Sequence, residues 1–185
     1  RLGRLEFLPE DIDVVVADDG GLPGLEELTR QGSPFRTVGI TGYPESHPAI
    51  DDDVTVQAMW DKRSHATNII SNMCFDPKMI SNWVKRVRRR GIELPIKIGV
   101  AGPVERTKLL TMATKVGVGE STRFLTKHAG WFARLAGPGY APEALIGKVA
   151  HDVGDEKYGV AGLHVFTFNQ VAETEAWRQK LLADL

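Results

Sequence analysis

Two adjacent carboxylates, Asp18 and Asp19, are followed by two glycines and preceded by an apolar run. A carboxylate in such a position can stabilise positive charge that develops on a substrate, and the glycines let a planar ligand approach the backbone. The residues by themselves favour a simpler interpretation, in which an Asp-Gly turn exposes both carboxylates to solvent. Both interpretations are kept open at this point.

The segment Gly42–Pro48, with the sequence GYPESHP, carries an aromatic ring, a carboxylate and an imidazole. Its two prolines fix φ and push the preceding residues, Tyr43 and His47, towards extended backbone, so the turn is stiff. These two side chains can stack on a flat cofactor or hydrogen-bond to it. The alternative is a structural turn. The sequence has no HExxH spacing and no Cys/His cluster, so we do not expect a metal at His47.

Three further polar residues have side chains that could contact a ligand. Lys62 and Arg63 end a helix-like segment and can neutralise a cofactor pyrophosphate, or they form an ordinary solvated helix end. Asn72 follows a short apolar run, and its amide offers a donor and an acceptor to a heterocycle with an amide-like edge. A turn or capping role explains Asn72 equally well.

Other groups that could carry chemistry favour structural roles. The glycine-rich segment Gly99–Pro103 lacks both the Lys-Ser/Thr of a P-loop and the GxGxxG pattern, which argues against nucleoside triphosphate chemistry. Cys74 is the single cysteine, so no internal disulfide forms, a reducing compartment is expected, and the thiol is predicted to be buried and inert. His128, His151 and His164 are expected to be structural.

The elements that must position these residues alternate between short apolar strands and helical patterns. Near-continuous apolar runs separated by helices predict a parallel sheet that is covered on both faces. The predicted strands are 13–17, 37–41, 68–71, 96–100 and 163–167. Helices are predicted over 24–31, 53–64, 77–90 and 104–116, with two more between 120 and 158. An Asp-Pro cap and a terminal glycine, Gly91, mark the limits of the third helix.

The α/β pattern fits either a doubly wound sheet or a (β/α)8 TIM barrel, and in both folds ligands bind at the carboxyl ends of the strands. A barrel needs eight strands and about 250 residues. The five strands predicted here leave three βα units absent or supplied by another chain. With no linker or internal repeat, we expect one domain over 1–185.

Composition excludes several classes of protein. The 23 Lys and Arg nearly balance the 24 Asp and Glu, so the net charge of −1 provides no general attraction to nucleic acid or anionic membranes. No apolar run approaches 18 residues and no secretory leader is visible, which indicates a cytoplasmic protein. The basic run Lys85–Arg90 is expected to be a solvated helix end stopped by glycine.

The order of the motifs is more specific than any one of them. GYPESHP is followed by ISNMCFDP over 70–77, by RGIELPIKIGVAGP over 90–103 and by GLHVFTFN over 162–169. Together these segments resemble the methylenetetrahydrofolate reductase family, most closely its short bacterial members, in collinear order over nearly the whole chain. The resemblance implies a flavin-containing (β/α)8 barrel of which this chain supplies the last five strands.

The resemblance also implies roles for individual residues. Asp19, with Asp18 beside it where the family has glycine, would lie by the flavin and folate and stabilise the iminium cation of methylenetetrahydrofolate. Tyr43 and His47 fall on contacts to FAD. Lys62 and Arg63 fall on a basic pair that contacts the cofactor, with a register uncertain by one or two residues, and Asn72 occupies the position of a glutamine that contacts folate.

Three departures from the family pattern bear on activity. Gln170 stands where many members have an arginine that meets the folate tail, and Asn72 is one methylene shorter than glutamine. The family's catalytic glutamate lies on its first strand. The segment Arg4–Pro9 resembles that motif, but it lies only about ten residues before Asp19, too close for the first and fourth strands of a barrel. We interpret this similarity as coincidence.

The resemblance therefore predicts an oxidoreductase that uses FAD to interconvert 5,10-methylenetetrahydrofolate and 5-methyltetrahydrofolate. The expected partners are a tetrahydrofolate one-carbon derivative and an electron donor such as NAD(P)H, with neither nucleic acid nor membrane; homo-oligomerisation is left open. Alternatives are a non-catalytic folate- or flavin-binding relative or assembly module without the N-terminal acid, another flavin-dependent barrel reductase, and part of a longer active enzyme.

Overall fold

The computed structural model describes residues 14–16, 21–45, 50–104, 111 and 142–183. Along the chain these form the following elements: β1 (Val14–Val16), α1 (Gly21–Arg30), β2 (Val38–Gly42), α2 (Asp52–Lys62), η1 (Arg63–His65), β3 (Asn68–Ser71), α3 (Pro77–Arg89), β4 (Ile96–Ala101), α7 (Glu143–Val153), η2 (Glu156–Tyr158), β5 (Val160–Phe166) and α8 (Val171–Ala183).

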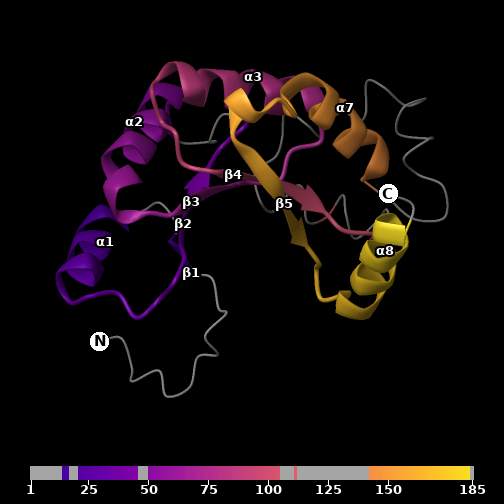
Figure 1. Ribbon diagram of the computed structural model, residues 1–185, viewed down its shortest axis with the longest axis horizontal. Helices are drawn as coiled ribbons and strands as arrows, with labels where there is room; N and C mark the ends of the chain where they lie inside the picture. The colour runs from indigo at the N-terminus through magenta and orange to yellow at the C-terminus, as the bar shows by residue number, and fades with distance from the viewer. Residues whose placement is uncertain (1–13, 17–20, 46–49, 105–110, 112–141, 184–185) are drawn as a thin grey trace.

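The five strands form one parallel sheet in the order β1-β2-β3-β4-β5, so each strand pairs with the next one in the chain. Figure 1 shows α1, α2, α3 and α7 as an arc along one side of these strands. A doubly wound sheet reverses its strand order and carries helices on both faces, whereas a barrel keeps sequential order with the helices outside. The fold is that of a (β/α)8 TIM barrel, of which the described chain contributes five strands.

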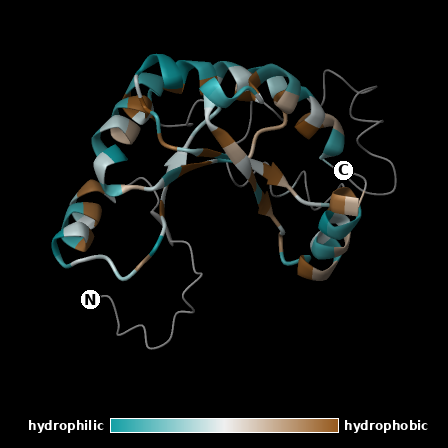
Figure 2. Cartoon of the chain, in the orientation of Figure 1, coloured by the Kyte–Doolittle hydropathy of each residue, from teal (hydrophilic) through white to brown (hydrophobic). Residues whose placement is uncertain are grey.

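The core lies between the outer face of the sheet and the arc of helices. Alternate strand residues such as Ile40, Ile69 and Ile98 point outward and pack with Trp83 of α3, and all four are almost fully buried. Figure 2 shows hydrophobic colour on the central strands and hydrophilic colour along the outer side of the arc. Burial of this apolar surface is the main contribution to the stability of the domain.

Close contact between β2 and α3 depends on Gly42, the last residue of β2. A Cβ atom built on Gly42 would lie 2.3 Å from Cζ2 of Trp83, a distance that real Cβ contacts do not reach. The absence of a side chain therefore lets the indole ring lie against the end of the strand, directly before Tyr43. The core thus fixes the start of the GYPESHP segment.

The helix α3 begins and ends at the predicted signals. Asp76 is the N-cap, its side chain accepts a hydrogen bond from Lys78 N, and Pro77 occupies the first turn. At the other end Gly91 has φ 77°, in the left-handed region that glycine adopts without strain.

One residue of the basic run departs from the expected solvated helix end. Arg88 donates four hydrogen bonds to backbone carbonyls, those of Tyr158 at 2.7 Å, Ile92 at 2.5 Å, Leu94 at 2.9 Å and Gly159 at 3.1 Å. Partial burial lowers the pKa of the Arg88 guanidinium, and the charge of Glu93 opposes that effect. The side chain therefore connects α3 to the segments that enter β4 and β5, at the amino ends of the strands.

The helix α8 was not expected from the sequence, because its residues carry no apolar stripe and Thr174 is its one buried residue among those described. Strand β5 begins three residues before its predicted start, with an irregularity opposite Ile96 and Lys97. Most of the predicted helix 104–116 and the first of the two helices expected after residue 120 lie outside the described residues, as does Glu6.

Candidate functional site at the carboxyl ends of the strands

The loops that follow β2, β3, β4 and β5 meet at one edge of the sheet, because all the strands are parallel. The described residues of these loops include Tyr43 after β2, Asn72 after β3, Gly102 after β4 and Gln170 after β5. Three residues predicted for the site, Tyr43, Asn72 and Gln170, therefore lie at the same edge, where ligands bind in parallel α/β folds.

The loops after β2 and β3 are tied together by their backbones. Asn72 N donates a hydrogen bond of 2.6 Å to the carbonyl of Gly42, which continues the parallel ladder past the end of β3. Tyr43 follows at once and is half-buried. The backbone at Tyr43 is thus held beside the loop that carries Asn72.

The amide of Asn72 is oriented by its own loop. Its Oδ1 accepts a hydrogen bond of 2.8 Å from Met73 N. The sequence suggested that Asn72 would offer both a donor and an acceptor. In the structure the acceptor is used locally, so the amide group can present N–H donors to a ligand.

On the inner face of the sheet, Gly99 of β4 lies in close contact with β3. Gly99 N donates a hydrogen bond of 2.8 Å to Ser71 Oγ, and a Cβ at position 99 would lie 2.1 Å from Ser71 O and 2.9 Å from Phe166 Cε2. A glycine is therefore required here for the approach of β3, β4 and β5. The GVAGP segment has this packing role, which its glycine content alone did not reveal.

The loop between β5 and α8 has an unusual backbone. Phe168 and Asn169 have φ angles of 50° and 68°, and such values are rare for a residue as bulky as phenylalanine. Two tight hydrogen bonds hold the turn, from Gln170 N to Thr167 O at 2.8 Å and from Thr174 N to Gln170 O at 3.0 Å. This constrained turn directs Gln170 and the first turn of α8 to the carboxyl edge.

Two side-chain oxygens at this turn are buried without a hydrogen-bond partner, Gln170 Oε1 and Thr174 Oγ1. Thr174 is 7% exposed and lies directly over Gly102, where a Cβ would be 2.9 Å from its Oγ1. Sequence reasoning did not identify Thr174, because a single threonine in a polar helix gives no pattern. The nearest indication in the sequence was Gly102 of the GVAGP segment, against which Thr174 packs.

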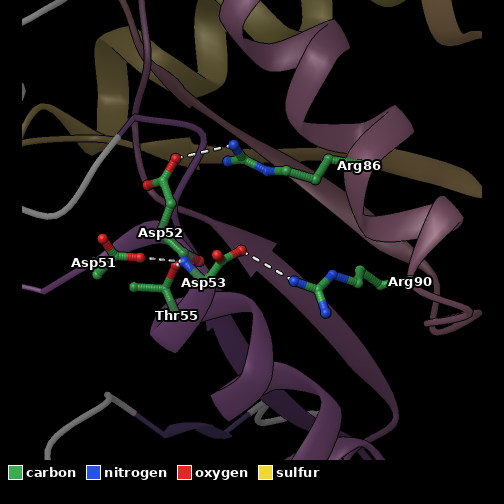
Figure 3. Close-up of polar contacts among 6 residues, drawn as sticks. All are labelled: Asp51, Asp52, Asp53, Thr55, Arg86 and Arg90. Carbon is green, nitrogen blue, oxygen red and sulfur yellow. Dashed lines mark hydrogen bonds and ion pairs between the residues drawn. The ribbon is translucent and has the colours of Figure 1, made fainter.

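The helix that follows the GYPESHP segment is fixed against α3 by charged groups, as Figure 3 shows. The side chain of Asp51 caps α2 by accepting a hydrogen bond from Asp53 N at 2.8 Å. Asp52 pairs with Arg86 at 2.9 Å, and Asp53 pairs with Arg90 at 3.0 Å. The Asp52–Arg86 pair is partly buried and the Asp53–Arg90 pair is exposed, and together with the cap they set where α2 starts after the loop.

Lys62 and Arg63 lie at the other end of α2. Lys62 is 5% exposed in the last turn, and Arg63 stacks its guanidinium 3.5 Å from the centre of the Trp60 ring. The 11 residues of α2 span about 16 Å, so the structure does not bring this pair together with Tyr43 and Asn72. A contact with the cofactor, which stays a prediction, requires an extended ligand that runs along α2.

The predicted residues Asp18, Asp19 and His47 lie outside the described residues, so their positions stay predictions as well. The described part of the chain contains no group of three or more His, Cys, Asp or Glu side chains that could hold a metal ion. In the same part of the chain, no helix has the length and apolar character needed to cross a membrane.

Comparison with known proteins supplies the family. Residues 25–126, more than half of the 185-residue chain, match the family model described as methylenetetrahydrofolate reductase. The chain belongs to the methylenetetrahydrofolate reductase family. The matched region contains β2, β3 and β4 with Tyr43, His47 and Asn72, as well as Lys62 and Arg63.

One relative in this family is methylenetetrahydrofolate reductase 2 of Saccharomyces cerevisiae. It is 29% identical over 101 residues, which cover 50% of this chain and 17% of the yeast protein. The chain thus matches a small share of its relative's length. Asp18, Asp19 and Gln170 lie outside the region that matches the family model, so the match does not bear on the roles predicted for them.

Proposed function

We propose that this protein is a flavin-dependent oxidoreductase that interconverts 5,10-methylenetetrahydrofolate and 5-methyltetrahydrofolate. Membership of the methylenetetrahydrofolate reductase family supports a folate-related oxidoreductase of one-carbon metabolism. The observation that carries the finer proposal is the meeting of Tyr43, Asn72 and Gln170 at the carboxyl edge of a partial barrel. In barrel enzymes, the active site is built at this edge.

The described side chains at this edge suit a flat cofactor next to a flat substrate. Tyr43 offers a half-buried aromatic ring, and Asn72 offers amide donors whose direction is set by the Met73 N contact. Gln170 adds a polar side chain at the same edge, and its Oε1 has no hydrogen-bond partner in the described part of the chain. A bound FAD would supply the hydride-transfer chemistry.

The chain's own residues would bind and orient the two rings. Tyr43 and His47 would contact the flavin, Asn72 would donate to an acceptor on the pterin, and Asp19 with Asp18 would place negative charge near the cation that develops on the substrate. Lys62 and Arg63 would meet the phosphate end of FAD if the cofactor extends along α2. FAD is thus the proposed cofactor, and a tetrahydrofolate one-carbon derivative is the proposed substrate.

Flavin binding tests this proposal. Purified protein is titrated with FAD, and bound cofactor is followed by the quenching of flavin fluorescence. We expect saturable binding that Tyr43→Ala weakens about fivefold, because a stacked aromatic contributes on the order of 1 kcal/mol. The matched control is Tyr158→Ala, a half-buried tyrosine that lies at the amino ends of the strands, outside the proposed site.

Three outcomes are informative. Equal loss in both tyrosine variants would indicate a general loss of stability and would remove the argument for Tyr43. Protein that binds no FAD at any concentration would overturn the flavin proposal. Protein that binds FAD and folate without turnover would identify a non-catalytic binding relative.

A further inference from the structure

An irregularity near the start of β5 decides which of its side chains face the interior of the barrel. Val160 pairs with Ile96, whereas Gly162 pairs with Lys97, the next residue of β4. Ala161 is therefore an extra residue in β5. Because successive side chains of a strand point to opposite faces, one extra residue exchanges the faces of all the residues that follow it. The φ angle of Gly162 is 151°, which a glycine adopts without strain.

After this bulge, His164 and Phe166 lie on the inner face of the sheet. They pair with Gly99 and Ala101 of β4, and a Cβ built on Gly99 would lie 2.9 Å from Cε2 of Phe166, so the phenyl ring covers the inner side of Gly99. The imidazole of His164 packs edge-on against that ring, with the two ring centres 4.8 Å apart. Val165, between them, packs against the outer core. Without the extra residue, His164 would point outward.

The register also places His164 level with two residues of the candidate site. On one side of β4, Gly99 lies opposite His164. On the other side it lies next to Asn72, since a Cβ at position 99 would be 3.1 Å from the carbonyl carbon of Asn72. Asn72 N is in turn bonded to the carbonyl of the residue before Tyr43. Inward-facing residues of a barrel are arranged in such layers, so His164 shares a layer with Tyr43 and Asn72.

The interior of β4 and β5 is not packed as barrel interiors usually are. Bulky branched side chains dominate the interior of most barrels. The inner positions of these two strands are instead Lys97, Gly99, Ala101, Gly162, His164 and Phe166. A Cβ built on Gly162 would meet no described atom within 4 Å, so the inner face is open two residues before His164, which is itself only partly buried. An imidazole beside open space suits a binding residue better than a core residue.

We infer that His164 is a further ligand-binding residue, and that its imidazole hydrogen-bonds to the polar edge of the substrate's pterin ring. The inference rests on the proposed folate function. An imidazole offers a donor and an acceptor, which match the N–H and C=O groups of that edge. The pterin is favoured over the flavin because β5 lies beyond β3 and β4 from Tyr43, the residue proposed for the flavin. The contact with Phe166 orients the imidazole.

The first test follows the histidine rings of wild-type protein by NMR. The Cε1–Hε1 signal of His164 is assigned through its proximity to the Phe166 ring, and 5-methyltetrahydrofolate is then added. We expect a saturable shift of this signal, and the same shift with a methylated tetrahydropterin that lacks the aryl and glutamyl parts. His151 on α7 is the internal control, because its side chain is 87% exposed and its signal should not move.

The second test measures affinity and stability. His164→Phe keeps an aromatic ring beside Phe166 but removes both ring nitrogens. Isothermal titration calorimetry should show binding of the folate and of the pterin weakened about fivefold, as for the loss of one hydrogen bond of about 1 kcal/mol. The melting temperature of the ligand-free variant should stay close to that of the wild type. His151→Phe, the matched control, should change neither affinity.

The outcomes separate this inference from the function on which it rests. If wild-type protein binds 5-methyltetrahydrofolate while the His164 signal stays in place, or if His164→Phe binds it equally well, the inference is refuted and the folate function stands. A shift caused by FAD but not by the pterin would overturn the assignment to the substrate, and a shift caused by the folate alone would overturn the assignment to its pterin ring. Wild-type protein that binds neither the folate nor the pterin would refute both proposals.

Discussion

Replacement of Arg88 by methionine should strongly destabilise the domain, although Arg88 belongs to a run of basic residues at a helix end. The guanidinium donates four hydrogen bonds to carbonyls of two separate segments. Methionine keeps the apolar stem and leaves these carbonyls without their donor. Each such bond contributes about 1 kcal/mol net, so partial compensation by water leaves an expected loss of about 3 kcal/mol. For a domain of this size, the melting temperature should fall by roughly 6–12 °C.

Two variants make this experiment specific. Arg88→Lys keeps the charge, but a single ammonium cannot reach all the carbonyls, so about half of the loss should remain. Arg89→Met removes the exposed neighbouring cation and should change the unfolding free energy by less than about 0.5 kcal/mol. Urea denaturation followed by circular dichroism measures all three. Equal stability of Arg88→Met and Arg89→Met would refute the role assigned to Arg88.

Further predictions concern the close packing of the sheet and the acid stability of α8. Gly99→Ala should cost about 3 kcal/mol or more in urea denaturation, because its Cβ would lie 2.1 Å from Ser71 O, and an unchanged midpoint would contradict that contact. A hydrogen bond from Arg178 holds the pKa of Glu175 at about 2. This lowered pKa contributes stability that is present above the unfolded value near 4.5 and is lost as the pH falls towards 2. Glu175→Gln should therefore flatten the melting temperature against pH between 5 and 2; a curve parallel to the wild type would argue against this pair.

Much of the sheet could be predicted from the sequence because each strand is a short apolar run between polar turns. β3 has the predicted bounds, Asn68–Ser71, and the Asp76-Pro77 cap correctly predicted the start of α3. The choice between a barrel and a doubly wound sheet could not be made from the strand patterns alone. It depends on which strands are neighbours, and the sequential pairing of β1 to β5 decides it.

The features that the sequence did not predict depend on tertiary contacts. Helix α8 buries little more than Thr174, so no apolar period marks it. Arg88 looks like the other arginines of its run until Tyr158, some 70 residues later, brings its carbonyl within reach. The local use of Asn72 Oδ1 likewise depends on loop geometry. Residue types at strand ends could indicate the edge that binds ligand, but not which atoms remain available there.

The central claim is the oxidation of a flavin by a folate substrate on this protein. Protein loaded with FAD is reduced without oxygen and mixed with 5,10-methylenetetrahydrofolate while the visible absorbance of the flavin is recorded. We predict that the absorbance of oxidised flavin returns and that one 5-methyltetrahydrofolate forms for each flavin oxidised. A reduced, protein-bound flavin that stays reduced in the presence of saturating substrate would contradict the proposed reaction.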